Sequence, residues 1–335
     1  MNRMPTRPFA DAGRAFAAVS PVLDGSVAAV VRIPAFRRPR LLRATLESLA
    51  GQRAARPFAV VIVDNDAMAS ESVPVAGEFL GSGKLGGLCL VEPHQGNCHA
   101  INAAFETALA TFPNARHFLM IDDDEVASPD WLAQMVRAAE TTGADVVGGP
   151  VWPVFDDVAK QNLERHPAFK PAYETSGAVP MIYGCGNCLI ARSVFERLGA
   201  PAFDLRFNFL GGGDTDFFYR CRRLGVRFHW VSEATINETV PQNRTSLSWL
   251  ITRGLRIGAI NYHVQRKATP TVWSRIKLGL KLFGALPLSL TYAVRAFLTE
   301  RKPSIAMHPM TVAVGGALAA IGIEPQPYKA SKIVS

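Results

Sequence analysis

The stretch HFLMIDDDEVASPDWL, residues 117–132, runs from a short apolar segment through four consecutive acids into a helical pattern. The apolar segment is typical of a buried strand, so Asp122, Asp123, Asp124 and Glu125 come at its carboxyl end. Carboxylates that close together repel one another and raise each other's pKa unless cations or strong hydrogen-bond donors lie nearby. The acids therefore predict a positively charged partner.

Strand-like and helix-like patterns alternate on both sides of this stretch. Strands are expected at residues 26–33, 58–66, 87–93, 117–122, 145–151 and 226–231, and helices at 39–52, 97–112 and 128–143. This alternation favours an α/β fold with a mainly parallel, Rossmann-like sheet and helices on both faces. Ser128 is expected to cap the helix that follows the acids.

The composition suits a folded protein that binds a polyanion. Among 335 residues, 36 basic side chains outnumber 28 acidic ones, for a net charge of +8. Nucleic acid, anionic lipid and phosphorylated substrates all fit this charge. Five cysteines and the absence of a secretory signal pattern favour reduced thiols in the cytoplasm. The CGNC motif at 185–188 has zinc-ligand spacing, but without a second pair we interpret these cysteines as ordinary buried residues.

The chain divides into three segments. Residues 1–25 are expected to form a loosely ordered leader, 26–240 the α/β domain, and 241–335 a set of helices. Two late stretches are apolar, but basic residues interrupt the first and the second is short, so neither is expected to span a membrane. Basic and apolar residues together favour a helix in the membrane interface, although helices packed on the core remain an alternative.

Paired acids at the strand ends point to metal and nucleotide binding. Asp122 and Asp124 form an Asp-x-Asp pair that can present oxygen ligands to Mg²⁺ or Mn²⁺. Asp64 and Asp66 end an earlier strand, where acids commonly bind a base or ribose. A solvated acidic turn and a simple strand-end turn are the respective alternatives.

The motif GGGDTD supplies a candidate catalytic base. Gly212 and Gly213 are expected to let a substrate approach, and Asp214 to accept a proton from it. Asp216 lies on the same helix start, and a helix N-cap is the alternative role for either acid.

These motifs in this order resemble the inverting nucleotide-sugar glycosyltransferases of glycosyltransferase family 2 over about residues 26–265. The resemblance rests on RIPAFRRPRLLRATLESLAGQ, VIVDND, GNCHAINAAF, FLMIDDDEVASPDWL, VVGGPVWPVF, GCGNCLIARSVFERLG, FDLRFNFLGGGDTDFFYR and ETVPQNRTSLSWLITRGLRIG. Within the family the chain is most similar to bacterial exopolysaccharide enzymes of the succinoglycan β-glucosyltransferase type. The resemblance implies a GT-A fold for 26–240, with helices at 241–335 that close the donor site.

The resemblance also implies roles for individual residues. It assigns nucleotide binding to Pro34, Ala35, Phe36, Arg37, Asp64, Asp66, Asn102, Asp122, Asp123 and Arg253. It assigns the metal to Asp124 with Asp122, the catalytic base to Asp214, and acceptor or accessory roles to Trp152, Gly212, Gly213, Asp216, Arg244 and Arg256. Two positions depart from the family pattern, because Gly213 replaces a common Glu and Ile101 replaces a common Arg. Diphosphate contacts are then expected to fall more on Arg37 and the late arginines.

The implied activity is an inverting, metal-dependent transfer of a sugar, with glucose expected, from a UDP-sugar to a lipid-linked oligosaccharide. The implied location is the cytoplasmic face of the plasma membrane, with peripheral contact through the C-terminal helices. A catalytically silent nucleotide-binding protein on the same fold is one alternative. A nucleotidyltransferase is another, although no Gly- and Lys-rich phosphate loop follows the first strand. Nucleic acid is not expected as a partner, because the basic residues are dispersed.

Overall fold

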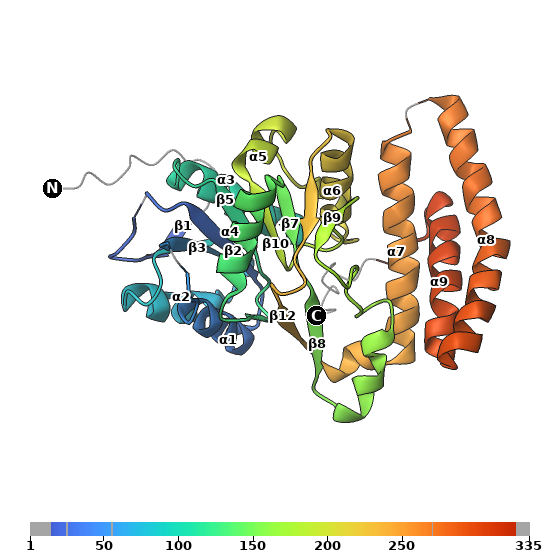
Figure 1. The fold of residues 1–335 in the computed structure, drawn as a ribbon, viewed down its shortest axis with the longest axis horizontal. Helices are drawn as coiled ribbons and strands as arrows, with labels where there is room; N and C mark the ends of the chain where they lie inside the picture. Colours follow the sequence, from blue (N-terminus) through green and yellow to red (C-terminus); the bar gives the residue numbers. More distant parts are fainter. Residues whose placement is uncertain (1–14, 25, 55, 270, 326–335) are drawn as a thin grey trace.

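The computed structural model describes residues 15–24, 26–54, 56–269 and 271–325. Its centre is a sheet with strand order β1-β4-β3-β2-β5-β10-β7-β11-β9, and a second sheet has the order β6-β12-β8 (Figure 1). The strands are β1 (Ala15–Val19), β2 (Ala29–Ala35), β3 (Phe58–Asp64), β4 (Gly87–Val91), β5 (His117–Met120), β6 (Glu125–Ala127), β7 (Val146–Gly148), β8 (Val151–Phe155), β9 (Gly177–Val179), β10 (Cys188–Ala191), β11 (Phe228–Trp230) and β12 (Ile236–Val240).

Helices cover both faces of the large sheet, as the sequence predicted. They are α1 (Pro39–Ala50), α2 (Ser72–Gly81), α3 (Asn97–Thr111), α4 (Trp131–Thr142), α5 (Arg192–Leu198), α6 (Gly213–Arg223), α7 (Leu247–Lys267), α8 (Val272–Glu300) and α9 (Pro303–Ala320), with 3-10 helices η2 (Val158–Arg165), η3 (Leu205–Phe207) and η4 (Gln242–Thr245). Strands β4, β3, β2 and β5 are parallel, whereas β10 runs antiparallel to both its neighbours. The sheet is thus parallel from β4 to β5, whereas strands on both sides of this parallel block run antiparallel to it.

Two hydrophobic cores flank the sheet because successive strand residues face opposite sides. In β3, Val61 and Val63 join the core beneath α3, α5 and α6, whereas Val60 and Ile62 join the core beneath α1, α2 and α4. A strand buried on both faces must be apolar throughout, which explains its continuous hydrophobic sequence.

Two local predictions were wrong. Residues 15–19 of the expected leader form the edge strand β1, which pairs antiparallel with β4; residues 1–14 and 25 lie outside the described part of the chain. Ser128 does not cap α4, which begins at Trp131 after Asp130. The backbone amide of Ser128 instead donates to Thr235 O over 3.0 Å, so this residue continues the small sheet.

The three C-terminal helices stand side by side at one end of the molecule (Figure 1). Helix α7 packs on α6, α9 packs on α7, and α8 lies outermost against α9. Within the described residues, α8 is the helix long and apolar enough to cross a membrane by length and composition, and only 11% of its most apolar window is buried.

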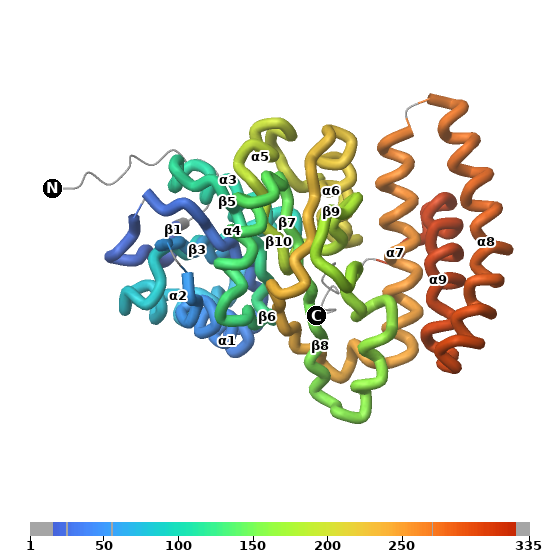
Figure 2. The backbone as a smooth tube through the Cα atoms, viewed as in Figure 1, coloured from blue at the N-terminus to red at the C-terminus, as the bar shows by residue number. Residues whose placement is uncertain are grey.

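The segment between β8 and β9 leaves the sheet and reaches these helices, as Figure 2 shows. Phe169 in this segment stacks on Trp249 of α7 with ring centroids 5.7 Å apart. Lys302, just before α9, donates to Asn162 O over 2.9 Å. This segment between β8 and β9 therefore joins the α/β domain to the C-terminal helices.

Candidate functional site

The acidic cluster, which comprises Asp122, Asp123, Asp124 and Glu125, lies where β5 ends and β6 begins. The last three of these residues are buried. Phe36 N donates to Asp123 Oδ2 over 3.0 Å. Asp122 N donates to Glu125 Oε2 over 2.7 Å. The cluster is therefore a fixed and largely buried group of carboxylates, and the alternative of a solvated acidic turn does not hold.

Two arginines approach the acidic cluster from different parts of the chain. Arg38, just before α1, donates through one NH group to Asp124 Oδ2 at 2.5 Å and to Asp123 Oδ1 at 3.2 Å. Arg244, in η4, donates to Glu238 Oε1 over 2.8 Å and lies 3.7 Å from Asp124 Oδ2. These guanidinium groups are part of the positively charged partner that the sequence predicted.

The arginines do not compensate all of the negative charge. Burial raises the pKa of Asp123 to about 7, and burial together with the charge of Asp124 raises the pKa of Glu238 to about 7. Burial, followed by the charge of Asp122, raises the pKa of Glu125 well above its ordinary value. Burial likewise raises the pKa of Asp122. A further cation would stabilise the ionised forms of these groups.

The residues present fit a hard divalent cation. Magnesium-type ions usually take one or two protein carboxylates and complete their coordination with water and substrate phosphates. Asp122 and Asp124 can supply two such oxygens beside Asp123 and Glu125, whose pKa values burial raises. Within the described residues, no set of three closely spaced ligand atoms includes them. An ion held here would therefore also need oxygens from a bound substrate.

Asp214, near the start of α6, lies within electrostatic reach of the acidic cluster. Thr215 N donates to Asp214 Oδ1 over 2.8 Å. Burial raises the pKa of Asp214, while the Thr215 amide and the charge of Arg256 oppose the rise. The charge of Asp214 in turn raises the pKa of Asp122. The fold thus brings these two aspartates, from different elements, within electrostatic reach of each other.

The glycines before Asp214 leave space that side chains of neighbouring helices fill. Gly212 has a left-handed φ of 83°, and a Cβ there would collide with the Ile260 side chain of α7. A Cβ at Gly213 would lie 2.8 Å from Cys98 Sγ. The space expected to admit a substrate is thus filled by α7 and α3, and the glycines set how closely these helices approach the site.

The carboxylate of Asp64, expected to contact the nucleotide base, accepts hydrogen bonds from the protein backbone instead. Its side chain is fully buried. Asp66 N donates to Asp64 Oδ1, and Ser72 N donates to Asp64 Oδ2, each over 2.9 Å. The carboxylate therefore fixes the turn between β3 and α2, and no face of it reaches solvent.

The other residues expected around the nucleotide gather at the carboxyl ends of β2 and β3. Arg37 Nε donates to Asp66 Oδ2 over 2.6 Å, and this hydrogen bond lowers the pKa of Asp66. The Arg37 guanidinium also lies 4.9 Å from the centroid of the Phe36 ring. Pro34 and Ala35 are the last residues of β2. An aromatic face, a cation and a carboxylate thus lie together at this edge.

Asn102 and Asp216 are engaged in structural contacts. Asn102 Nδ2 donates to Phe203 O and Phe203 N donates to Asn102 Oδ1, both over 2.8 Å. Asp216 Oδ2 accepts from Arg220 Nε over 2.8 Å and from Lys267 Nζ over 2.9 Å. These contacts tie α3 and α6 to neighbouring segments, so neither residue joins the acidic cluster.

Trp152 and Arg253 have contrasting surroundings. Trp152 on β8 is 45% exposed and pairs in register with Asn237, the residue before Glu238. Arg253 on α7 has a buried Nε with no hydrogen-bond partner among the described residues. A buried guanidinium nitrogen of this kind is suited to a phosphate oxygen. The acceptor role of Trp152 and the diphosphate role of Arg253 stay predictions.

Sequence reasoning missed Arg38 and Glu238. Arg38 follows Arg37 in IPAFRRPR, and the sequence analysis assigned a binding role to Arg37 alone. Glu238 lies on β12, in register with Glu125 on β6. The motif ETVPQNRT contained Glu238, but only the pairing of two short strands brings it to the acidic cluster.

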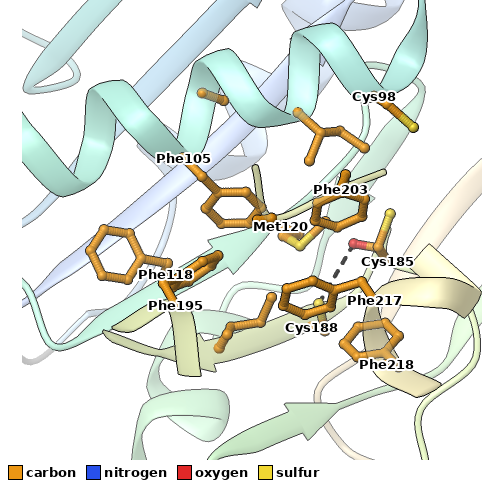
Figure 3. Close-up of a cluster of buried hydrophobic side chains, with 14 of the residues drawn as sticks. Cys98, Phe105, Phe118, Met120, Cys185, Cys188, Phe195, Phe203, Phe217 and Phe218 are labelled. Carbon is orange, nitrogen blue, oxygen red and sulfur yellow. Dashed lines mark hydrogen bonds between the residues drawn. The ribbon is translucent and has the colours of Figure 1, made fainter. Parts of the chain in front are cut away.

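The cysteines are structural. All five are free and buried. Cys98, Cys185 and Cys188 lie among the phenylalanines of the core beneath the site (Figure 3). Burial raises the pKa of Cys98 to about 12 and that of Cys185 well above its ordinary value. Protonated thiols in an apolar core support the interpretation of CGNC as ordinary buried residues.

Comparison with known proteins agrees with this arrangement. The family model described as "Glycosyl transferase family 2" matches residues 30–199, and that described as "Glycosyl transferase family group 2" matches residues 117–318. The chain is 33% identical over 227 residues to the succinoglycan biosynthesis protein ExoM of Rhizobium meliloti (strain 1021). That alignment covers 67% of this chain and 70% of the relative.

A solved structure has a similar fold. It is the mannosyltransferase PcManGT from Pyrobaculum calidifontis in complex with GDP-Man and Mn²⁺, at a TM-score of 0.58 and 20% sequence identity. The superposition covers 91% of this chain and 89% of that one. The fold is therefore the GT-A fold of nucleotide-sugar transferases, with helices added at its C-terminus.

Proposed function

The chain belongs to glycosyltransferase family 2, and from this membership we propose an inverting transfer of a sugar from a nucleotide sugar to a hydroxyl group. We propose UDP as the nucleotide and glucose as the sugar. The acceptor is a lipid-linked saccharide in exopolysaccharide or cell-surface polysaccharide synthesis. Similarity to a succinoglycan biosynthesis protein supports the exopolysaccharide part of this proposal.

The observation that supports the proposal is that the buried Asp214 lies within electrostatic reach of Asp122. A base that removes a proton from a sugar hydroxyl works best when its pKa is raised toward the working pH. Burial raises the pKa of Asp214, and burial, with a smaller contribution from the charge of Asp214, raises the pKa of Asp122. In the proposed reaction, Asp214 accepts the hydroxyl proton as the oxygen attacks the anomeric carbon, and configuration at that carbon inverts.

The acidic cluster and its arginines serve the departing diphosphate in this proposal. Asp122 and Asp124 would hold Mn²⁺ or Mg²⁺, which when bound neutralises charge on the leaving group. Arg244 and Arg253 are proposed to bind diphosphate oxygens, because guanidinium forks match phosphate geometry. Arg37, Phe36 and Asp66 are proposed to contact the nucleoside.

We propose that the α/β domain, which includes β1 in addition to the expected residues 26–240, is the catalytic domain, and that the helices in 241–335 both close the donor site and contact a membrane. The enzyme would then act at the cytoplasmic face of the plasma membrane, where a lipid-linked acceptor is embedded. The exposed apolar surface of α8 supports this location.

The proposed base is tested by Asp214→Asn, measured as UDP release and as product formed. We expect kcat to fall by about 10²- to 10⁴-fold, with donor binding retained, because the amide cannot accept the proton. Asp130→Asn is the matched control, since Asp130 is half exposed before α4 and should leave kcat unchanged. An Asp214→Asn enzyme that is folded, binds donor and turns over normally would remove Asp214 from the mechanism.

The donor and metal are tested by following nucleotide release from a panel of nucleotide sugars with and without Mn²⁺. The proposal expects UDP-glucose to be preferred and activity to require the ion. Nucleotide binding without turnover for every sugar and acceptor would favour the catalytically silent alternative.

A further inference from the structure

Glu92, His94 and His99 form a compact group of metal-ligand side chains between the end of β4 and the first turn of α3. Each offers one ligand atom, and these atoms all lie within 4.8 Å of one another. Glu92 is buried, and His94 Nδ1 lies 2.8 Å from Glu92 Oε1. The His94 and His99 rings stack with centroids 5.4 Å apart. A buried carboxylate thus faces two imidazoles that reach the surface.

The loop that carries this group is fixed from two sides. Asn65 Nδ2 donates to His94 O over 2.8 Å and to Glu92 O over 3.1 Å. On the other side, Asn208 Nδ2 donates to Gln95 O over 3.0 Å. These hydrogen bonds fix the backbone of the loop, and so the positions from which the Glu92 and His94 side chains project. The group therefore has the support expected of a binding site.

The ligand set favours a particular class of metal. Two imidazoles and one carboxylate are a common ligand set of Zn²⁺ sites that keep a fourth position open. Ligand atoms about 2.0–2.2 Å from a shared tetrahedral ion stand roughly 3.3 Å apart. The ligand atoms lie within 4.8 Å of one another, so an ion would draw them closer, and the 67% exposed His94 side chain has room for this adjustment.

We propose that Glu92, His94 and His99 bind one Zn²⁺ ion or another borderline divalent transition metal. This site is separate from the acidic cluster, which lies at the β5–β6 junction and offers carboxylate oxygens. Imidazole nitrogen favours zinc-like ions, whereas an all-oxygen site favours Mg²⁺ or Mn²⁺. The two sites therefore select different metals, and the zinc site does not depend on the proposed sugar transfer.

Metal binding to the tag-free, full-length protein tests the proposal without donor or acceptor. The protein is stripped with a chelator and titrated with Zn²⁺ against a chromophoric competitor. We expect one tight Zn²⁺ site, weakened at least about tenfold in both His94→Ala and His99→Ala. Since His94 is exposed, its variant should fold normally, as circular dichroism will check.

Two controls make the outcome specific. His229→Ala removes a histidine on β11, near the opposite edge of the sheet from β4, and should bind Zn²⁺ as the parent does. Asp124→Ala should also keep the tight Zn²⁺ site while Mn²⁺ binding is weakened. Equal Zn²⁺ affinity in the parent, His94→Ala and His99→Ala would overturn the proposal. Loss of the tight site in Asp124→Ala would overturn it as well, because the ion would then belong to the acidic cluster.

Discussion

Arg38 is placed to compete with a divalent ion for Asp124. Its NH group lies 2.5 Å from Asp124 Oδ2, so the guanidinium and an ion at that oxygen would repel each other. We predict that Arg38→Met raises the affinity for Mn²⁺ in the absence of nucleotide by about tenfold, equivalent to roughly 1.4 kcal/mol. The same change should lower the Tm of the metal-free protein, because buried carboxylates lose their counter-charge. Calorimetric titration and thermal unfolding measure the two effects.

Arg40→Met is the matched control for this prediction. Arg40 is an exposed arginine two residues further along, in the first turn of α1. It should change neither the Mn²⁺ affinity nor the Tm appreciably. If Arg38→Met binds Mn²⁺ no more tightly than Arg40→Met, Arg38 does not compete with the ion.

The sequence predicted the strand-end position of Asp122 but not which arginines reach the acidic cluster. Asp122 lies just beyond the end of a strand, and parallel strands bring such residues to one edge, so its place followed from pattern. The choice between Arg37 and Arg38 did not follow from pattern. Arg37 has a left-handed φ of 54°, which separates the directions of two adjacent side chains. One turns to Asp66 and the other to Asp124.

Among the helices, α7 and α9 approach closely because glycines line their contact. A Cβ at Gly258 would collide with the Val312 carbonyl, and one at Gly315 would collide with the Leu255 carbonyl. We predict that Gly258→Ala lowers the free energy of unfolding by about 1–3 kcal/mol, because the added methyl group forces the helices apart. Denaturant unfolding measures the loss, and limited proteolysis shows whether α9 is released.

Gly279 provides a matched control on α8. A Cβ there would meet no atom within 4 Å. Gly279→Ala should therefore leave stability unchanged or raise it by up to about 1 kcal/mol, because alanine favours helix. Equal effects at the two positions would show that close packing at Gly258 is not what holds α9.

The contact between η2 and α9 should weaken in acid. His308 faces His166, and their ring centroids are 5.2 Å apart. Burial, and then the charge of His166, lower the pKa of His308 to about 4. Neighbouring side chains from α7 and α9, including Leu250 and Met307, offer no counter-charge. The neutral form is thus favoured in the folded state, and the stability it contributes is present above about pH 6.5 and lost as the pH falls toward 4.

We predict that His308→Gln flattens this pH dependence. Glutamine stays neutral, so the variant should lose less stability than the parent between pH 7 and pH 5. The expected difference is on the order of 1–2 kcal/mol at pH 5, discounted for partial exposure. Hydrogen exchange of the α9 backbone amides measures this stability difference at the helix itself. If the parent and the variant lose the same amount of stability between pH 7 and pH 5, protonation of His308 is not the cause of the loss.

The positions of helices and strands were predictable where an apolar pattern extended over many residues. They were missed where a strand forms only because it pairs with another strand. The apolar run that became β3 could only be a strand buried on both faces. The five residues of β1 have no such pattern, and their structure depends on pairing with β4. The short strands β6 and β12 likewise form by pairing with each other. The sequence pattern therefore did not predict that Glu238 lies opposite Glu125.

The arrangement of the whole molecule constrains how it meets a membrane. Helix α8 is outermost, while α9 separates it from α7, which packs on the α/β domain (Figure 1). If α8 crossed a bilayer in this arrangement, α9 and the polar helix α7 would be carried into the hydrocarbon with it. Arg253 and Arg256 on α7 make that costly. The arrangement therefore favours α8 lying in the plane of the interface.

The outer face of α8 has the pattern of an interfacial helix. Exposed apolar side chains follow at helical spacing at Trp273, Ile276, Leu280, Phe283, Leu290 and Val294. Basic residues flank this stripe at Arg275, Lys277, Lys281 and Arg295. Such a helix buries its apolar stripe at the acyl boundary while its cations meet anionic headgroups.

We predict that the double variant Trp273→Glu, Phe283→Glu lowers binding to vesicles of phosphatidylcholine and phosphatidylglycerol by more than tenfold. Both side chains are over 70% exposed, so the protein itself should remain folded. Burying each aromatic side chain in lipid is worth about 1.5–3 kcal/mol, and the new carboxylates are repelled by anionic lipid. Vesicle flotation measures the bound fraction, and added salt should weaken the headgroup-dependent part.

Met68→Glu is the matched control, because Met68 is 93% exposed on the loop after β3, away from the C-terminal helices. Its flotation should equal that of the parent protein. If the double variant also floats like the parent, the stripe on α8 does not face lipid. In that case the exposed apolar side chains would have to be covered by protein, and a concentration-dependent shift in oligomeric state that the double variant abolishes would identify a second copy of the chain as the cover.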